Sequence, residues 1–378
     1  MKMMEIPVLL LTGYLGSGKT TLVNKILGNR KGIKFAVIVN DIGEVNIDAS
    51  LIQKDGIVGT KDDSLVALQN GCICCTLKMD LVQQITDIVA MGRFDYLVIE
   101  ASGICEPEPI ARTICSIPYM GEEYTRNGTA RLDCIVTVVD ARRMRDEFSC
   151  AKDLLRGNLG EDDIESLVIQ QVEFCNVILL NKASEISAED RGKVKEIIRQ
   201  LQPKAGIVEC DFAEVDFDSI LNTGLFDYDS VAGSAAWIEE VEKGAVENEE
   251  EGESEEYGIG TYVYFNRRPL DINKFDEFVA RRWPAGIIRA KGMCYFSENI
   301  DECYIFEQAG AQIGMKSVGK WYAAMPEDEL RRQLESDATL RRDWDERYGD
   351  RMQKLVFIGQ HLDRDAIREA LDFCLEEE

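Results

Sequence analysis

Histidine is almost missing from this chain, since His361 is the only one among 378 residues. A site built from several imidazoles is therefore excluded. Long apolar runs are missing too, because no stretch approaches the roughly 20 residues that a membrane-spanning helix needs. The apolar run from Ile6 to Leu11 is too short for the core of a secretory signal peptide and leads straight into a glycine-rich loop. We therefore expect a cytoplasmic protein.

Positive charge is also scarce. The chain has 43 Lys and Arg against 69 Asp and Glu, a formal net charge of -26, and no Lys/Arg-rich run. Nucleic acids and anionic membrane surfaces would repel such a protein, so we expect neither as a partner. In a reducing cytoplasm its 12 cysteines remain thiols. We expect core packing for the six that stand singly in apolar stretches, which are Cys115, Cys134, Cys150, Cys175, Cys210 and Cys374.

The first part of the chain alternates short β-rich runs with helical patterns. Continuous apolar runs such as Tyr96–Glu100 are typical of strands buried on both faces, hence of a parallel sheet. The alternation predicts an α/β, doubly wound domain over residues 1–230. The predicted strands are Val8–Thr12, Phe35–Asn40, Tyr96–Glu100, Cys134–Asp140 and Asn176–Asn181, and the predicted helices Thr20–Leu27, Leu77–Met91 and Ala188–Leu201.

An acidic segment divides the chain. Residues 231–257 include the run Glu-Asn-Glu-Glu-Glu-Gly-Glu-Ser-Glu-Glu, which repels itself and predicts a solvated linker. Residues 258–378 then predict a smaller α+β domain. Its expected strands are Gly260–Phe265, Met293–Phe296, Glu302–Glu307 and Lys354–Ile358, and its expected helices Asp271–Arg282, Glu327–Tyr348 and Asp365–Leu375.

One segment near the N-terminus fits a phosphate-binding loop (P-loop) in full. Residues 13–20 read Gly-Tyr-Leu-Gly-Ser-Gly-Lys-Thr, between a predicted strand and a predicted helix. Backbone N–H groups of such a loop, with the helix N-terminus, attract phosphates. We expect Lys19 to reach the β- and γ-phosphates and Thr20 to hold Mg²⁺. The predicted nucleotide-binding residues here are Gly13, Gly16, Ser17, Gly18, Lys19, Thr20 and Thr21.

Two acidic residues end or follow predicted strands beside this loop. Glu100 ends an apolar strand, where a carboxylate can order Mg²⁺ or the attacking water, and Gly103 follows where a backbone N–H could sense the γ-phosphate. Asp41 follows another strand. We predict Lys19, Glu100 and Asp41 as the catalytic residues.

The element that reads the base is less complete. Asn181-Lys182 follows a strand, as in the guanine-reading pattern Asn-Lys-x-Asp, but the fourth position is Ser184. A serine hydroxyl cannot accept two charge-assisted hydrogen bonds from the guanine edge. Glu185 could replace the missing acid only if the loop shifts by one residue. GTP is the expected nucleotide, and ATP stays open.

A cluster of cysteines is the second chemical feature. Gly71-Cys72-Ile73-Cys74-Cys75 places three thiols within four residues, and thiolates are ligands suited to Zn²⁺ and, less selectively, Co²⁺. Glu44 is a candidate extra ligand. The alternatives are a disulfide or redox chemistry, which a reducing cytoplasm disfavours. Cys105 is interpreted as a bystander rather than a ligand.

These motifs together resemble the CobW-like P-loop GTPases, relatives of the hydrogenase and urease nickel-insertion GTPases. In the first domain the resemblance rests on Gly13–Thr20, Asn40–Val45, Gly71–Cys75, Glu100–Gly103 with Glu106-Pro107, and Asn181-Lys182. In the second it rests on Tyr264–Pro269, Arg289–Gly292, Gly319–Tyr322 and Leu355–Gly359. The chain departs from the family at Ser184, and in having an acidic linker where a His-rich segment is common.

The resemblance implies a GTPase that delivers Zn²⁺ or Co²⁺ to a client metalloprotein, with Cys72, Cys74 and Cys75 as ligands and Asn181 and Lys182 on the guanine. We expect GTP and Mg²⁺ to order the segments of Asp41, Glu44 and Glu100, and hydrolysis to release the metal. The rivals are a P-loop kinase of small molecules with structural cysteines, a metal buffer with a vestigial nucleotide site, and a carrier that uses ATP. The sequence leaves a homodimer open.

Overall fold

The computed structural model describes residues 5–28, 32–39, 78–149, 164–228, 258–284, 286–310, 312–337, 340–341 and 344–377. These residues form two compact units, which we call the N-terminal unit (up to residue 228) and the C-terminal unit (from residue 258). The predicted linker at 231–257 lies outside the described residues, so its boundaries remain predictions. Among the helices described, none is long and apolar enough to span a membrane.

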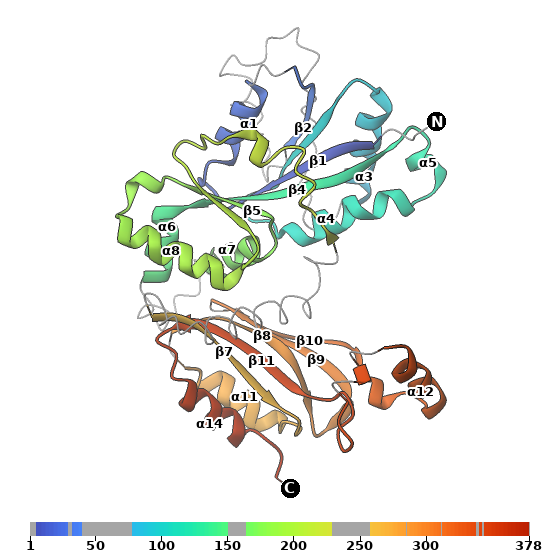
Figure 1. Cartoon of the computed structure of the whole chain (residues 1–378), viewed down its shortest axis with the longest axis vertical. Coiled ribbons are helices and arrows are strands. Elements are labelled where there is room, and N and C mark those ends of the chain that lie inside the picture. The colour runs from blue at the N-terminus through green and yellow to red at the C-terminus, as the bar shows by residue number, and fades with distance from the viewer. Residues whose placement is uncertain are drawn as a thin grey trace. The chain divides into compact units, whose positions relative to one another are not determined.

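The N-terminal unit is built on a six-stranded sheet in the order β2-β3-β1-β4-β5-β6 (Figure 1). Every neighbouring pair in this sheet is parallel. The strands are β1 (Glu5–Thr12), β2 (Phe35–Val39), β3 (Tyr96–Glu100), β4 (Thr129–Asp140), β5 (Val177–Asn181) and β6 (Gly206–Glu209). The doubly wound α/β fold expected from the sequence is confirmed.

Helices flank both faces of this sheet (Figure 1). On one face, Leu22, Val23 and Ile26 of α1 pack on Leu9 and Leu11 of β1. Since side chains alternate along a strand, Val8 and Leu10 point to the opposite face and are buried there too. The helices are α1 (Lys19–Leu27), α3 (Lys78–Met91), α4 (Pro107–Ser116), α5 (Glu122–Thr125), α6 (Ala141–Ser149), α7 (Ile164–Glu173) and α8 (Ala188–Leu201).

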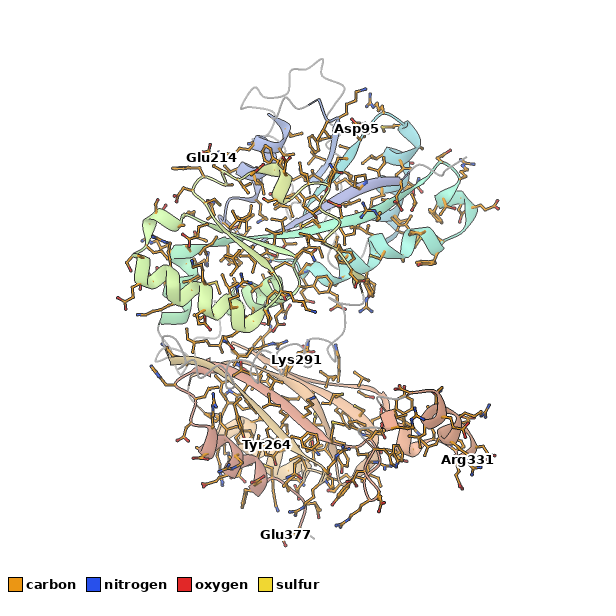
Figure 2. All side chains as sticks on the ribbon, viewed as in Figure 1. Asp95, Glu214, Tyr264, Lys291, Arg331 and Glu377 are labelled. Carbon is orange, nitrogen blue, oxygen red and sulfur yellow. The ribbon has the colours of Figure 1, made fainter. Side chains whose placement is uncertain are left out.

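The C-terminal unit is a five-stranded antiparallel sheet in the order β10-β9-β8-β11-β7. Two helices cover one face of it around an aromatic core, and the Tyr264 hydroxyl donates to Asp372 on one of these helices at 2.8 Å (Figure 2). The strands are β7 (Ile259–Asn266), β8 (Ile287–Phe296), β9 (Asn299–Ala309), β10 (Gln312–Lys320) and β11 (Gln353–Gln360). The helices are α11 (Ile272–Arg281), α12 (Glu327–Ser336) and α14 (Arg364–Phe373).

One helix is shorter than the sequence predicts. The expected helix Glu327–Tyr348 is not continuous: α12 ends at Ser336 and Asp337 is not helical, whereas Leu340 and Arg341 are helical again and the chain from Trp344 is not. The Asp337 carboxylate accepts a hydrogen bond from the Leu340 N–H, and the Asp345 carboxylate accepts from Arg347 and Tyr348. The Asp337 acceptor is placed as a cap for the helical residues that follow it, whereas the Asp345 acceptor offers the backbone an alternative to helical bonds.

Candidate functional site

The glycine-rich loop lies between β1 and α1, as expected. Gly13 and Gly18 have backbone φ angles of +132° and +115°, which side chains with a Cβ rarely adopt. A Cβ on Gly13 would lie 2.2 Å from the Val138 carbonyl oxygen, and one on Gly18 would lie 2.4 Å from Nδ2 of Asn181. Glycine is therefore required at both positions for the loop to turn under its neighbours.

The polar side chains of the loop are drawn inward. The Lys19 ammonium donates to the carbonyls of Gly13 (2.7 Å) and Tyr14 (3.2 Å), so it stays over the loop. The Thr20 hydroxyl donates to Oε1 of Glu100 at 2.9 Å, which joins the start of α1 to the end of β3. The Ser17 hydroxyl is 2% exposed and makes no hydrogen bond within the described residues. Thr21, which the sequence also predicts here, is exposed.

The segment after β3 touches the loop directly. A Cβ on Gly103 would lie 2.7 Å from the backbone nitrogen of Leu15, so the two backbones are in close contact. The buried Gln171 amide on α7 donates to the carbonyls of Gly103 (3.3 Å) and Cys105 (3.2 Å). Gly103 is thus placed at the P-loop by a residue that the sequence analysis did not single out.

Asn181 ends β5 and Lys182 follows it, beside the same loop. The Asn181 amide, 2% exposed, donates to the Ser17 carbonyl at 2.7 Å and accepts from the Ala213 N–H at 2.9 Å. Lys182 has a φ of +59°, and its ammonium pairs with the carboxylate of Asp140 at the end of β4. Asn181 therefore connects the P-loop with the loop 210–213 that follows β6.

Loop 210–213 brings a further acid to the site. The Asp211 carboxylate accepts from the Ser184 hydroxyl at 2.9 Å and from the Ser184 N–H at 3.1 Å. Phe212, next to it, is 78% exposed and has a φ of +52°. Sequence reasoning missed both residues. The available signal was an acid and an aromatic residue directly after a short strand.

The described cysteines do not form a metal site. Cys134, Cys175, Cys210 and Cys374 are buried, as expected, and Cys115 is half-buried. Burial raises the pKa of the Cys134 thiol to about 12, so it stays protonated at neutral pH. Cys105 is buried as well, and no group of three potential metal ligands occurs within the ranges that the structure describes.

The predicted metal site belongs to another part of the chain. Cys72, Cys74 and Cys75, with Glu44 and the predicted catalytic Asp41, lie outside the described residues, and so does Cys150. The structure describes only the residues that flank this segment (residues 40–77). It begins after β2, in which Val39 pairs with Glu100 of β3, and it ends where α3 begins at Lys78.

Two family models match the chain. Residues 7–209 match "CobW/HypB/UreG, nucleotide-binding domain", and residues 259–375 match "Cobalamin synthesis protein cobW C-terminal domain". The first match covers more than half of the sequence, and the second covers most of the C-terminal unit.

Individual proteins show the same similarity. Zinc-regulated GTPase metalloprotein activator 1 of Dictyostelium discoideum is 35% identical over 386 residues, which cover 98% of this chain and 80% of that protein. The zinc chaperone YjiA of Escherichia coli is 31% identical over 229 residues, 59% of this chain and 63% of YjiA. The crystal structure of Zn(II)-bound YjiA GTPase aligns over 99% of this chain and 100% of its own, with 22% identity and a TM-score of 0.42.

Proposed function

Because the chain belongs to the CobW/HypB/UreG family, we propose that it is a GTP-dependent metal carrier. It binds GTP with Mg²⁺, holds Zn²⁺ or Co²⁺ on the thiolates of Cys72, Cys74 and Cys75, hydrolyses GTP, and passes the ion to a client metalloprotein. A reducing cytoplasm, where thiolates persist, is the compartment that this chemistry needs.

The observation that carries the nucleotide half of the proposal is the packing around the P-loop. Lys19 is held over the loop by two carbonyls, and the Ser17 hydroxyl is buried beside it without a hydrogen bond from the described residues. Phosphate oxygens are acceptors for both groups. Gly13 and Gly18 leave no volume for a side chain there. These donors fit a triphosphate.

The same region fits Mg²⁺. The Thr20 hydroxyl and the Glu100 carboxylate are 2.9 Å apart, and hard oxygen donors are the ligands that Mg²⁺ prefers. When bound, the ion neutralises charge on the β- and γ-phosphates. Glu100, at the end of a buried strand, is also suited to orient the attacking water, while Gly103 presents its backbone beside the loop.

The path of the chain supports coupling between the nucleotide and the thiolates. The segment 40–77 contains Asp41, Glu44 and the three cysteines, and it starts beside Glu100 through the pairing of β2 with β3. Its other end continues through α3 and β3 back to Glu100. A change at the strand end on hydrolysis therefore acts on the start of this segment, which provides a route for lowering metal affinity.

The decisive experiment is Zn²⁺ affinity of the full chain by competition with a chromophoric chelator, without nucleotide, with GDP, and with Mg²⁺ and a GTP analogue that resists hydrolysis. We expect tighter binding with the GTP analogue than with GDP, by about 5- to 150-fold, the usual range of coupling between two sites. Cys74→Ser should abolish the tight site, and Cys115→Ser, which changes a half-buried thiol elsewhere, should not.

Two outcomes would overturn the proposal. Equal Zn²⁺ affinity in all three nucleotide states would separate the sites energetically and favour structural cysteines. A Cys74→Ser variant with full Zn²⁺ affinity would remove the proposed ligands. Free phosphate released from GTP, as opposed to a phosphorylated small molecule, distinguishes the carrier from a P-loop kinase.

A further inference from the structure

We propose that Asp211 supplies the carboxylate that recognises the guanine base, with Ser184 holding it in place and Phe212 offering the face on which the base stacks. This inference rests on the proposed function, because it names the residues that select the nucleotide at the same site. It explains how a chain with serine in the fourth position of Asn-Lys-x-Asp can prefer GTP.

The first step is the contact between Ser184 and Asp211. The two residues are 27 positions apart, yet both the hydroxyl and the N–H of Ser184 donate to one oxygen of Asp211, Oδ1. The side chain is therefore fixed by two bonds through a single oxygen. The other oxygen, Oδ2, accepts no hydrogen bond from the described residues. It is available to a ligand, since Asp211 is only partly buried.

The second step is the position of Asp211 relative to the phosphates. The Asn181 amide joins the Ser17 carbonyl of the P-loop to the N–H of Ala213, two residues after Asp211. The Ala183 N–H donates to the Cys210 carbonyl at 3.2 Å, which ties the loop after β5 to the loop after β6. Lys25 of α1 pairs with Glu214 at 3.6 Å just beyond (Figure 2). These contacts hold Asp211 beside the nucleotide site.

The third step is chemical. Guanine presents N1–H and N2–H₂ as two neighbouring donors, and the free Oδ2 of an ionised Asp211 has lone pairs that accept from them with charge assistance. Adenine presents an acceptor at N1 instead, which the carboxylate would repel. A serine hydroxyl offers no comparable discrimination. In this chain serine stands in the fourth position of the pattern, and the acid comes from the loop after β6.

The fourth step concerns Phe212. Its ring is 78% exposed, and both Phe212 and Ala213 have positive φ angles, of +52° and +53°. Two consecutive non-glycine residues in this conformation are strained, and such strain is concentrated at functional sites. An exposed aromatic ring beside a base-reading carboxylate is a stacking surface, which favours every base alike.

The test is displacement of a fluorescent GDP analogue from the full chain by GDP, ADP and xanthosine diphosphate. Wild type should prefer GDP to ADP. In Asp211→Asn the GDP affinity should fall by about 10- to 100-fold, as expected for a lost charged hydrogen-bond pair. Xanthosine diphosphate should gain affinity, because the new amide N–H₂ can donate to the xanthine O2. The ADP affinity should not fall, and Asn can still accept the Ser184 bonds.

Glu185→Gln is the matched control, because Glu185 is the neighbouring exposed acid that could replace the fourth residue of the pattern. It should behave as wild type. Phe212→Ala should weaken GDP and ADP together, by about 10-fold, the loss of one stacked base. Two outcomes would overturn the role of Asp211 but leave the proposed GTPase function standing. One is a change of base preference in Glu185→Gln. The other is an unchanged preference in Asp211→Asn while wild type selects GDP. Equal affinity of wild type for GDP and ADP would count against the proposed GTPase itself.

Discussion

At the scale of single residues, Asp133 is a carboxylate with no exposed surface in the middle of the N-terminal unit. Tyr96 donates to it at 2.6 Å, and the N–H groups of Thr223 (3.0 Å) and Gly224 (2.9 Å) do the same. Burial, and then the bond to Asp133, raise the pKa of Tyr96 well above its ordinary value. The Arg131 guanidinium, on the same strand as Asp133, lies 3.6 Å from Oδ1, so the buried carboxylate is satisfied by groups from β3, from β4 and from a distant loop.

Tyr96→Phe removes one of these donors without creating a large cavity. We expect the free energy of unfolding to fall by about 2 kcal/mol, since hydrogen bonds to charged groups contribute about 1.5–3 kcal/mol. Urea denaturation followed by far-ultraviolet circular dichroism measures this. Tyr119→Phe is the control, because Tyr119 is 90% exposed, and the two variants should differ. Equal stability of both would show that the bond to Asp133 contributes nothing.

Some site residues could be predicted from the sequence and others could not, for one physical reason. Lys19, Thr20 and the loop glycines form a contiguous pattern whose spacing dictates its geometry. Asp211 is held, in our proposal, by Ser184, which lies 27 residues away, so only the pairing of β5 with β6 brings the two together. Glu100 was expected at the site, but its bond to Thr20 required the order of the sheet.

At the scale of elements, α11 shows how one side chain starts a helix. The Asp271 carboxylate accepts from the N–H groups of Asn273 (2.8 Å) and Lys274 (2.9 Å). Phe275 and Phe278 of the same helix then pack into the core of the C-terminal unit. The cap therefore supports both the helix and the packing of its aromatic face on the sheet.

Asp271→Ala should lower the free energy of unfolding of the C-terminal unit by about 1 kcal/mol, as for other lost N-caps. Asp271→Asn keeps an acceptor at the cap and should cost much less. All four tryptophans follow residue 230, so their fluorescence during urea denaturation reports this half of the chain. An Asn variant as unstable as the Ala variant would mean that the charge, not the cap, is what matters.

Helices and strands were predicted best where the pattern of apolar residues alone determines the secondary structure. The buried strands β3 and β5 have continuous apolar sequences and were predicted to within one residue. Strand β10 was missed because all nine of its residues are exposed at the edge of the sheet, so its sequence carries no buried face. The helix expected to run to Tyr348 is interrupted at Asp337, whose carboxylate caps the helical residues Leu340 and Arg341, and near its expected end Asp345 binds the backbone of Arg347 and Tyr348 instead.

At the scale of the whole molecule, both units bury thiols that keep their protons. Burial raises the pKa of Cys134 in the first unit to about 12 and that of Cys303 in the second to about 12. Free thiols ionise near pH 8.5. The folded state therefore binds more protons than the unfolded state above that pH.

The stability that these thiols contribute is complete below about pH 8.5 and is lost as the pH rises toward their folded pKa values. We expect the urea midpoint to fall between about pH 8 and about pH 10. The net charge of -26 would also destabilise the protein by repulsion as the pH rises. Added salt screens repulsion but leaves proton release unchanged, so a pH dependence that disappears in high salt would contradict the role of the thiols.

The Asn181 amide joins two loops that come from different parts of the sheet. Its nitrogen bonds to the Ser17 carbonyl of the P-loop and its oxygen to the Ala213 N–H, so it joins the two loops that, in our proposal, bind the phosphates and the base. A substitution that removes both hydrogen bonds of Asn181 would release both loops at once. Phosphate affinity and base preference would then decline together. A variant at Asn181 therefore cannot separate phosphate binding from base recognition. A genetic screen that finds such a variant would not show which of the two interactions had been lost.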